Sequence, residues 1–294
     1  MKKLDKILIL GSSGLIGHQV YFHFSKNKKY KIYDISLNRK VSANTILFDL
    51  KNFNKLEKII EEIKPNYIIN CCGMLINASN KDPESAILLN SYLPYYLSKI
   101  ADNFKSKLIH ISTDCVFSGD KGKYREHDIK DGTSIYSKTK SLGEINTNNH
   151  LTIRTSVVGP ELKLESEELL NWFLSQKNKI YGYKKSLWSG VTTIYLAQLI
   201  EELINKKING IYQVTTNKSI SKYELLVLFN KYSRLNIKII PINGIITNKT
   251  LVDTRKLIKL KIPSYNIMIK ELFEFISKNK NKYNHYYLDN KNLC

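Results

Sequence analysis

The chain has 294 residues, enough for one large domain or two small ones, and its composition is that of a folded protein. No apolar run approaches the roughly 20 residues that span a bilayer, so we expect no membrane partner. The net charge of +20 comes almost entirely from lysines, which are spread along the sequence, whereas there are only five arginines. Because arginine is the usual bidentate reader of phosphate and guanine, we also expect no nucleic-acid partner. The positive field should still attract anionic ligands such as nucleotides.

The N-terminus and the cysteines point to a reducing compartment. The Ile/Leu run after Lys6 is short and ends at glycines, whereas a secretory peptide needs a longer apolar core and a small-residue cleavage site. Neither the six histidines nor the four cysteines have metal-ligand spacing. We expect a cytoplasmic location, no metal, and free thiols at the cysteines. These are Cys71, Cys72, Cys115 and Cys294.

The first predicted element, residues 6–10, is a continuous apolar run typical of a buried parallel strand. It leads directly into Gly11-Ser-Ser-Gly-Leu-Ile-Gly17, and then into a helical stretch that ends near Asn27. Glycines at this spacing permit a tight turn and a close approach to a pyrophosphate, and the helix N-terminus supplies free N–H groups. We therefore predict a dinucleotide-binding turn. Its expected cofactor contacts are Gly11, Ser13, Gly14, Leu15, Ile16 and Gly17.

The second predicted strand, 30–36, should end where the adenosine ribose lies. An acid about 20 residues beyond the glycines would hold the 2′-hydroxyl of NAD, whereas a nearby arginine favours the 2′-phosphate of NADP. Asp34 falls inside this strand, with Ser36 at its tip and Arg39 just beyond. NADPH is therefore the preferred expectation. If the strand ended two residues earlier, Asp34 would become the ribose acid and NADH the cofactor.

The next elements repeat the order strand, helix, strand. This alternation predicts an α/β fold with a Rossmann-type, doubly wound parallel sheet. Pro94 should kink the longer of the two helices. The ends of two strands should meet the cofactor at Asp49 and Leu50 and at Cys71, Cys72 and Gly73. The strands are expected over 46–50, 66–73 and 108–111, and the helices over 56–64 and 82–102.

Regularity falls beyond the strand predicted over 151–155. With no internal repeat and no long linker, we expect a smaller substrate-binding cap that is interleaved with the cofactor domain. The cofactor domain should comprise 1–157 plus about 189–215, and the cap about 158–188 and 216–294. Ser221 and Glu224 form a capping box that should open a helix. The further expectations are helices over 165–176, 191–205 and 221–234, a strand over 210–214, a loop over 184–190 and a polar surface tail from 278.

The stretch from 107 to 144 carries the chemistry. Tyr136 and Lys140 lie four residues apart, on one face of the helix predicted over 136–145, and Thr113 ends the preceding strand. A ketone that accepts hydride becomes an alkoxide and needs a proton. A phenol can donate that proton if a nearby ammonium lowers its pKa, while a small hydroxyl steadies the oxygen. We predict these roles for Tyr136, Lys140 and Thr113, with Lys140 also holding the nicotinamide ribose.

Taken together, these motifs resemble the extended short-chain dehydrogenases/reductases, and specifically the dTDP-4-dehydrorhamnose reductase group. That group reduces nucleotide-linked 4-keto-6-deoxy sugars, and the similarity runs nearly from end to end. The resemblance implies that Thr113, Tyr136 and Lys140 are catalytic and that 70–73 and Asn90 belong to the cofactor site. The matching segments are 11–17, 48–50, 70–73, Asn90, 112–119, 136–140, 143–144, 154–156, 190–193 and 210–214.

The function implied by the resemblance is NAD(P)H-dependent reduction of a nucleotide-diphospho-4-keto-6-deoxy sugar in surface polysaccharide or deoxysugar biosynthesis. Two alternatives stay open. One is an NAD-dependent epimerase or dehydratase of the same superfamily, but dehydratases usually carry Asp-Glu where this chain has Asp114-Cys115. The other is a non-catalytic, cofactor-binding regulatory subunit, against which the intact Thr, Tyr and Lys argue. Besides the sugar nucleotide, a homodimer is the partner to consider.

Three departures from the family pattern concern the sugar side of the site. Cys115 stands where the family often has tyrosine, 71–74 reads Cys-Cys-Gly-Met, and Val157 replaces a common aromatic residue. The sugar and the nucleotide therefore stay open. Asp114 either orients Thr113 or caps the turn after the strand. The expected substrate contacts are Asp114, Cys115, Val116 and Trp188, with Tyr183 as a second stacking ring and Lys184, Lys185 and Arg255 as diphosphate ligands.

Overall fold

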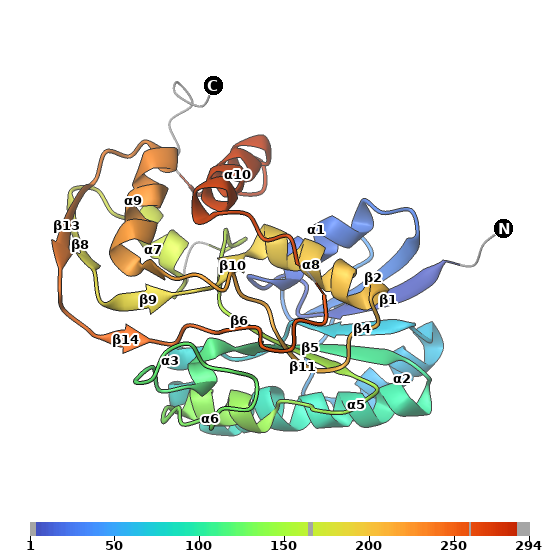
Figure 1. The fold of residues 1–294 in the computed structure, drawn as a ribbon. Coiled ribbons are helices and arrows are strands. Elements are labelled where there is room, and N and C mark those ends of the chain that lie inside the picture. The colour runs from blue at the N-terminus through green and yellow to red at the C-terminus, as the bar shows by residue number, and fades with distance from the viewer. Residues whose placement is uncertain (1–3, 164–166, 259, 287–294) are drawn as a thin grey trace.

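The computed structural model of the chain describes residues 4–163, 167–258 and 260–286. At its centre lies a seven-stranded parallel sheet with the strand order β11-β6-β5-β4-β1-β2-β3 (Figure 1). The strands run outward from β1 in both directions, so the predicted Rossmann-type doubly wound fold is confirmed. The strands are β1 (Asp5–Leu10), β2 (Tyr30–Ser36), β3 (Ile46–Leu47), β4 (Tyr67–Asn70), β5 (Lys107–Thr113), β6 (Leu151–Thr155) and β11 (Gly210–Gln213).

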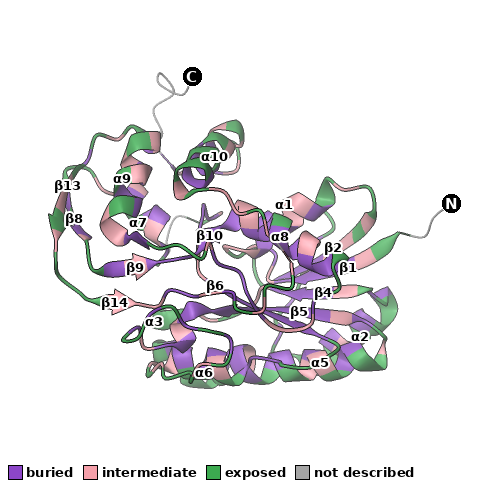
Figure 2. Ribbon diagram, viewed as in Figure 1, coloured by how far each residue is buried: buried purple, intermediate pink, exposed green. Residues whose placement is uncertain are grey.

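Helices cover both faces of this sheet, which explains the continuous apolar run in β1. Ile7 and Ile9 pack in one cluster with α1 (Gly17–Ser25) and α8 (Thr193–Asn205). Leu8 and Leu10 pack in another with α2 (Phe53–Ile63) and α5 (Leu93–Asn103). Successive side chains of a strand point to opposite faces, and here both faces are buried. Figure 2 shows the buried strands between helices whose outer sides are exposed.

The helix predicted over 82–102 is continuous but not uniform. It comprises α4 (Pro83–Ala86), a π-helical segment (Ile87–Tyr92) and α5, in which Pro94 occupies the first turn. Proline lacks an N–H group, and its ring collides with a carbonyl of the preceding turn in a regular helix. The wider π turn before Pro94 accommodates it. The same segment carries Asn90, which is fully buried.

A separate apolar cluster lies beside the sheet, at the upper left of Figure 1. It includes α7 (Leu169–Leu174), α9 (Lys222–Ser233) and α10 (Tyr265–Lys278). The capping box of Ser221 and Glu224 opens α9 as predicted. This part of the chain falls within the predicted cap, although the division into domains stays a prediction. The small sheets are β7 (Val157–Val158) with β10 (Val191–Thr192), β8 (Lys179–Tyr183) with β13 (Lys238–Ile242), and β12 (Ile220–Ser221) with β9 (Ser186–Trp188) and β14 (Thr247–Asn248).

Two local predictions for the second half were wrong. The loop predicted over 184–190 contains β9, which pairs with β12 and β14. The tail predicted on the surface turns inward, because Tyr283 is only 1% exposed and its hydroxyl lies 3.0 Å from His18 Nε2 of α1. Residues 287–294 of that tail, with Cys294, lie outside the described residues. Helix α10 and the strands β8, β13 and β14 were not predicted. No helix among the described residues is long and apolar enough to cross a membrane.

Candidate active site

The turn between β1 and α1 is shaped by its first and last glycines. Gly11 has φ of +76°, and a Cβ there would lie 3.1 Å from the backbone of Cys72. A Cβ on Gly17 would lie 2.0 Å from the Gly11 carbonyl oxygen. Glycine is therefore required at both positions. In the described residues no side chain caps α1, and its first turn has no acid. This helix N-terminus fits the pyrophosphate of a dinucleotide.

The end of β2 lies beside the glycine turn. Asp34 is buried within the strand and accepts a hydrogen bond from Ser12 Oγ at 2.6 Å. Burial raises the pKa of Asp34 above its ordinary value. Ser36 is the last residue of β2, with its Oγ 2.6 Å from Ser13 Oγ, and Arg39 is exposed beyond it. The strand therefore ends where the sequence placed its end.

Thr113 is the last residue of β5, at the same edge of the sheet as the glycine turn. Its hydroxyl donates to Asp114 Oδ1 at 3.2 Å and accepts from the backbone N–H of Cys115 at 3.1 Å. The turn after the strand is thus capped by Thr113 itself. Of the two roles left open for Asp114, the structure supports orientation of the Thr113 hydroxyl.

Helix α6 (Ile135–Leu142) presents Tyr136 and Lys140 to this edge. Burial raises the pKa of Tyr136, with Cys115 acting in the same direction and a side-chain hydrogen bond between Tyr136 and Thr113 opposing them. Lys140 Nζ donates to the Ile111 carbonyl at 2.7 Å, and burial lowers the pKa of Lys140 to about 8. The expected role of Lys140 in lowering the Tyr136 pKa stays a prediction, and it would act against burial, which raises that pKa. A phenol with a raised pKa stays protonated at neutral pH, as a proton donor must.

A buried ion pair holds the end of α6 against the sheet. Arg154 of β6 donates to Glu144 through Nε at 2.9 Å and Nη2 at 2.7 Å. Ser112, next to Thr113, donates to the same carboxylate at 2.7 Å. The two hydroxyls and the ammonium of the predicted catalytic set are therefore positioned by one network, since Glu144 ties α6 to both β5 and β6.

The 71–74 turn lies between the glycine turn and Lys140. Burial raises the pKa of Cys72 to about 11 and that of Cys71 further, which suits packing residues rather than reactive thiols. Asn90 Oδ1 accepts from Met74 N at 2.8 Å, and its Nδ2 lies 3.2 Å from Thr139 Oγ1. The expected cofactor contact of Asn90 is therefore corrected: its buried amide joins this turn to α6.

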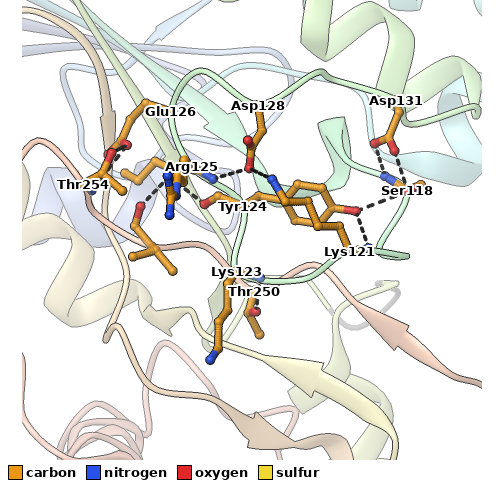
Figure 3. Close-up of polar contacts among 12 residues, drawn as sticks. Ser118, Lys121, Lys123, Tyr124, Arg125, Glu126, Asp128, Asp131, Thr250 and Thr254 are labelled. Carbon is orange, nitrogen blue, oxygen red and sulfur yellow. Dashed lines mark hydrogen bonds and ion pairs between the residues drawn. The ribbon is translucent and has the colours of Figure 1, made fainter.

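The loop between Thr113 and Tyr136 is held by a distant segment, 247–254, which we call the strap (Figure 3). Tyr124 N donates to the Thr250 carbonyl at 2.7 Å, and Val252 N donates to the Tyr124 carbonyl at 2.9 Å. The Tyr124 ring stacks on Phe117 with centroids 4.1 Å apart. Thr254 donates to the Glu126 carboxylate. Sequence reasoning missed the strap, because no local pattern links segments more than 120 residues apart.

The predicted substrate contacts divide into two groups. Cys115 is partly exposed beside Thr113 and Tyr136, and burial raises its pKa to about 11. Val116 is completely buried under the loop. Trp188 is also buried, packs against Tyr265 and donates from Nε1 to Ser156 Oγ at 2.9 Å. The substrate contacts expected of Val116 and Trp188 are therefore corrected, since both side chains are buried among other apolar residues. Asp49 is exposed after β3, whereas Leu50 is buried in the core.

The predicted diphosphate ligands also need a correction. Arg255 donates to the carbonyls of Asn209 and Ile211 at 2.7 and 2.6 Å, at the start of β11. That edge is opposite to the carboxyl ends of the strands, so Arg255 cannot reach a substrate beside Thr113. Tyr183 is partly buried at the end of β8, and Lys184 and Lys185 are exposed next to it. Sequence reasoning missed two closer lysines, Lys222 of α9 and Lys249 of the strap, which both lower the pKa of Asp114, although burial raises it overall.

Comparison with known proteins identifies the family. The family described as RmlD substrate binding domain matches residues 5–245. The chain belongs to this family. It is 27% identical over 234 residues to methionine adenosyltransferase 2 subunit beta of Xenopus laevis, covering 75% of this chain and 70% of that protein. It is 30% identical over 143 residues to dTDP-4-dehydrorhamnose reductase of Aggregatibacter actinomycetemcomitans, covering 48% of this chain and 46% of that one.

Solved structures agree with this membership at the level of the fold. The dTDP-4-dehydrorhamnose reductase of Bacillus anthracis in complex with NADP superposes with a TM-score of 0.80 at 21% identity, covering 93% of this chain and 100% of that one. A UDP-glucose 4-epimerase of Thermotoga maritima gives 0.77 at 17% identity, covering 93% of this chain and 99% of that one. The resemblance to extended short-chain dehydrogenases/reductases of the RmlD type is confirmed, and a nicotinamide cofactor is consistent with the fold.

Proposed function

We propose that this RmlD-family protein is an NADPH-dependent reductase of a nucleotide-diphospho-4-keto-6-deoxy sugar in polysaccharide or deoxysugar biosynthesis. The observation that carries the proposal is the convergence of Thr113, Tyr136 and Lys140 beside the glycine turn. Strand β5 supplies the first residue and α6 the other two. The family includes dTDP-4-dehydrorhamnose reductases, and such an enzyme would work in the cytoplasm.

Each residue has a definite task in this reaction. Bound NADPH would supply the hydride. The Thr113 hydroxyl, now directed at Asp114, would turn to hold the carbonyl oxygen of the sugar. Tyr136, protonated at neutral pH, would give its phenolic proton to that oxygen. Lys140, next to the 71–74 turn, would hold the nicotinamide ribose.

The preference for NADPH rests on the end of β2. Asp34 is turned inward onto Ser12, so its carboxylate is engaged within the protein. Arg39 is instead exposed just beyond the strand tip, where the adenosine ribose should lie, whereas the Ser36 hydroxyl is buried and lies 2.6 Å from Ser13 Oγ. A guanidinium suits a 2′-phosphate, which a carboxylate at the strand tip would repel.

The substrate proposed here is anionic, and the cationic residues near Thr113 support that class. Lys222 and Lys249 approach Asp114 from the cap and from the strap. A diphosphate on this side of the site would meet both ammonium groups. The part of the substrate that decides the sugar would face Cys115, where the family often has tyrosine.

A spectrophotometric assay tests the proposal. Purified protein is mixed with NADPH and a panel of nucleotide-linked 4-keto-6-deoxy sugars, while the nicotinamide absorbance is followed. We expect oxidation of NADPH with at least one sugar, and none with Tyr136→Phe. Tight NADPH binding without oxidation by any sugar would reject the reductase. A reaction that proceeds with NAD on a 4-hydroxy sugar, without net oxidation, would favour an epimerase.

The second candidate is a regulatory subunit. Similarity to methionine adenosyltransferase 2 subunit beta over 75% of the chain favours it. The intact Thr113, Tyr136 and Lys140 favour the enzyme.

A homodimer also belongs to the proposal, because Tyr92, Tyr95 and Leu142 are exposed on the outer sides of the helices. Sedimentation of the purified protein would test it.

A further inference from the structure

His110 of β5 lies next to Lys140, although the proposed reduction assigns it no task. The imidazole is completely buried. Its Nδ1 is 3.2 Å from Asn70 Nδ2, and its Nε2 is 3.4 Å from Lys140 Nζ. A buried imidazole in contact with a predicted catalytic ammonium needs a physical explanation, because two groups that can both be cationic repel each other in a low dielectric.

The hydrogen bonds of Asn70 determine which nitrogen of His110 carries the proton. Asn70 Oδ1 accepts from the backbone N–H of Cys72 at 3.1 Å, so its NH₂ group faces His110. An NH₂ group only donates, so Nδ1 must accept and the imidazole proton lies on Nε2. This N–H points at Lys140. A lysine ammonium has three donors and no acceptor, whereas the neutral amine has a lone pair.

Two arrangements pair both ring nitrogens of His110 with Asn70 and Lys140. In the first, Lys140 is neutral and accepts from His110 Nε2–H, and the Asn70 amide keeps its bond to Cys72. In the second, Lys140 is an ammonium that donates to Nε2, which moves the imidazole proton to Nδ1. Asn70 must then turn its oxygen to His110, and the Cys72 N–H loses its acceptor. The charge of Lys140 is thus linked to the backbone of the 71–74 turn.

We propose that His110 is a positioning residue that couples the protonation of Lys140 to the hydrogen bonds of Asn70 and the 71–74 turn. The turn lies where the cofactor is proposed to pass, so the charge state of the lysine and the shape of the cofactor site would change together. The kinetic part of this inference rests on the proposed function. Its structural part does not, because tautomers can be observed without turnover.

The other ionisable groups that face Lys140 favour its charged form, against the effect of burial. Glu144 after α6 and the thiols of Cys72 and Cys71 at the end of β4 favour the charged amine, while burial favours the neutral one and lowers the pKa of Lys140 to about 8. Burial and Lys140 together hold the pKa of His110 well below its ordinary value. His110 therefore stays neutral while Lys140 titrates, as the coupling requires.

The structural part is tested by nuclear magnetic resonance of protein labelled with ¹⁵N-histidine. Replacement His110→Gln, or His110→Asn if the first variant does not fold, identifies the His110 signals by their loss. We expect a neutral imidazole with its proton on Nε2 at pH 9, and a shift toward the Nδ1–H form as the pH falls below about 8. An imidazolium, or one unchanged tautomer across this range, would overturn the coupling.

The kinetic part compares two buried histidines. In His110→Gln the amide oxygen can accept a hydrogen bond from the Lys140 ammonium at every pH. The alkaline limb of the kcat/KM profile should therefore shift to higher pH by about one unit, a tenfold change in proton affinity. His150→Gln is the matched control, because His150 is equally buried and bonds to Leu108 N of the same strand at 3.2 Å. Its profile should keep the native limb. Identical limbs in both variants would make His110 a packing residue. Failure of every sugar to react would reject the proposed function and leave the tautomer experiment to decide.

Discussion

Arg154 and Glu144 form a buried bidentate pair whose closest atoms are 2.7 Å apart, with side chains 1% and 0% exposed. The pair joins β6 to the end of α6. Because α6 carries Tyr136 and Lys140, the Arg154–Glu144 pair also determines how far these two groups lie from Thr113. Charges buried at this depth are stable only when paired, so the network ties the integrity of the fold to the spacing of the site.

Glu144→Gln should therefore destabilise the protein strongly. The change leaves the Arg154 guanidinium buried without its counter-charge, a loss of about 3–5 kcal/mol for comparable pairs. Urea unfolding followed by circular dichroism measures it. Glu274→Gln is the control, because Glu274 pairs with Lys270 on the surface at 3.7 Å and such pairs contribute about 0–1 kcal/mol. Equal effects of both changes would contradict the role given to the buried pair.

Tyr136→Phe should abolish turnover and leave cofactor binding intact. Loss of a positioned proton donor typically lowers kcat by about 10²–10⁴-fold, while the phenyl ring keeps its packing. Steady-state kinetics and a fluorescence titration with NADPH separate the two effects. The matched control is Tyr95→Phe, an exposed tyrosine of α5. A native rate in Tyr136→Phe would show that another group supplies the proton.

Thr113→Val and Thr113→Ser should differ. Valine has the shape of threonine but cannot hold the carbonyl oxygen, so kcat should fall by about 10²–10³-fold, as for other lost oxyanion donors. Serine keeps the hydroxyl that is directed at Asp114 and should retain most of the rate. The measurement is kcat with a saturating sugar. Equal rates in the two variants would remove the hydroxyl from the mechanism.

The cofactor preference can be tested at the end of β2. Arg39→Ala should lower the NADPH-over-NADH ratio of kcat/KM by about tenfold or more, because a charge-assisted hydrogen bond contributes about 1.5–3 kcal/mol. Ser36→Asp places a carboxylate at the strand tip and should move the preference toward NADH. Lys28→Ala serves as the control, since Lys28 is exposed before β2. An unchanged ratio in Arg39→Ala would refute the NADPH assignment.

Because of Glu168, the free energy of unfolding should decrease as the pH rises from mildly acidic to mildly alkaline values. Burial raises the pKa of Glu168 from 4.5 to about 8, despite hydrogen bonds from the backbone of Leu170 and Asn171. The folded state holds this proton more tightly than the unfolded chain. The stabilisation is therefore complete below pH 4.5 and is lost as pH rises to about 8, at up to about 1.4 kcal/mol per unit.

Glu168→Gln should flatten this dependence, since the amide keeps an acceptor for the N-terminus of α7 and does not titrate. Urea midpoints at pH 5, 6.5 and 8, in the native protein and the variant, would check it, with Glu274→Gln as a surface control. A variant as steep as the native protein would mean that other groups, such as the neighbouring Glu161, carry the pH dependence.

Features that depend on local pattern were determined by the sequence alone. The apolar run before Gly11, the spacing of Gly11 and Gly17, the strand that ends at Thr113 and the four-residue interval from Tyr136 to Lys140 each follow from helix and strand periodicity. Parallel strands bring their carboxyl ends to one edge of the sheet, so the sequence alone predicts that the candidate site lies at this edge.

Only the tertiary structure decided which distant side chains support that site. The Arg154–Glu144 pair, the strap on Tyr124, and His110 between Asn70 and Lys140 join residues that no local period relates. The structure also shows that Arg255 lies at the far edge of the sheet and that Trp188 is buried in the core, where the sequence had predicted substrate contacts. Orientation and charge of a buried group depend on neighbours far along the chain, because burial removes the water that would otherwise screen them.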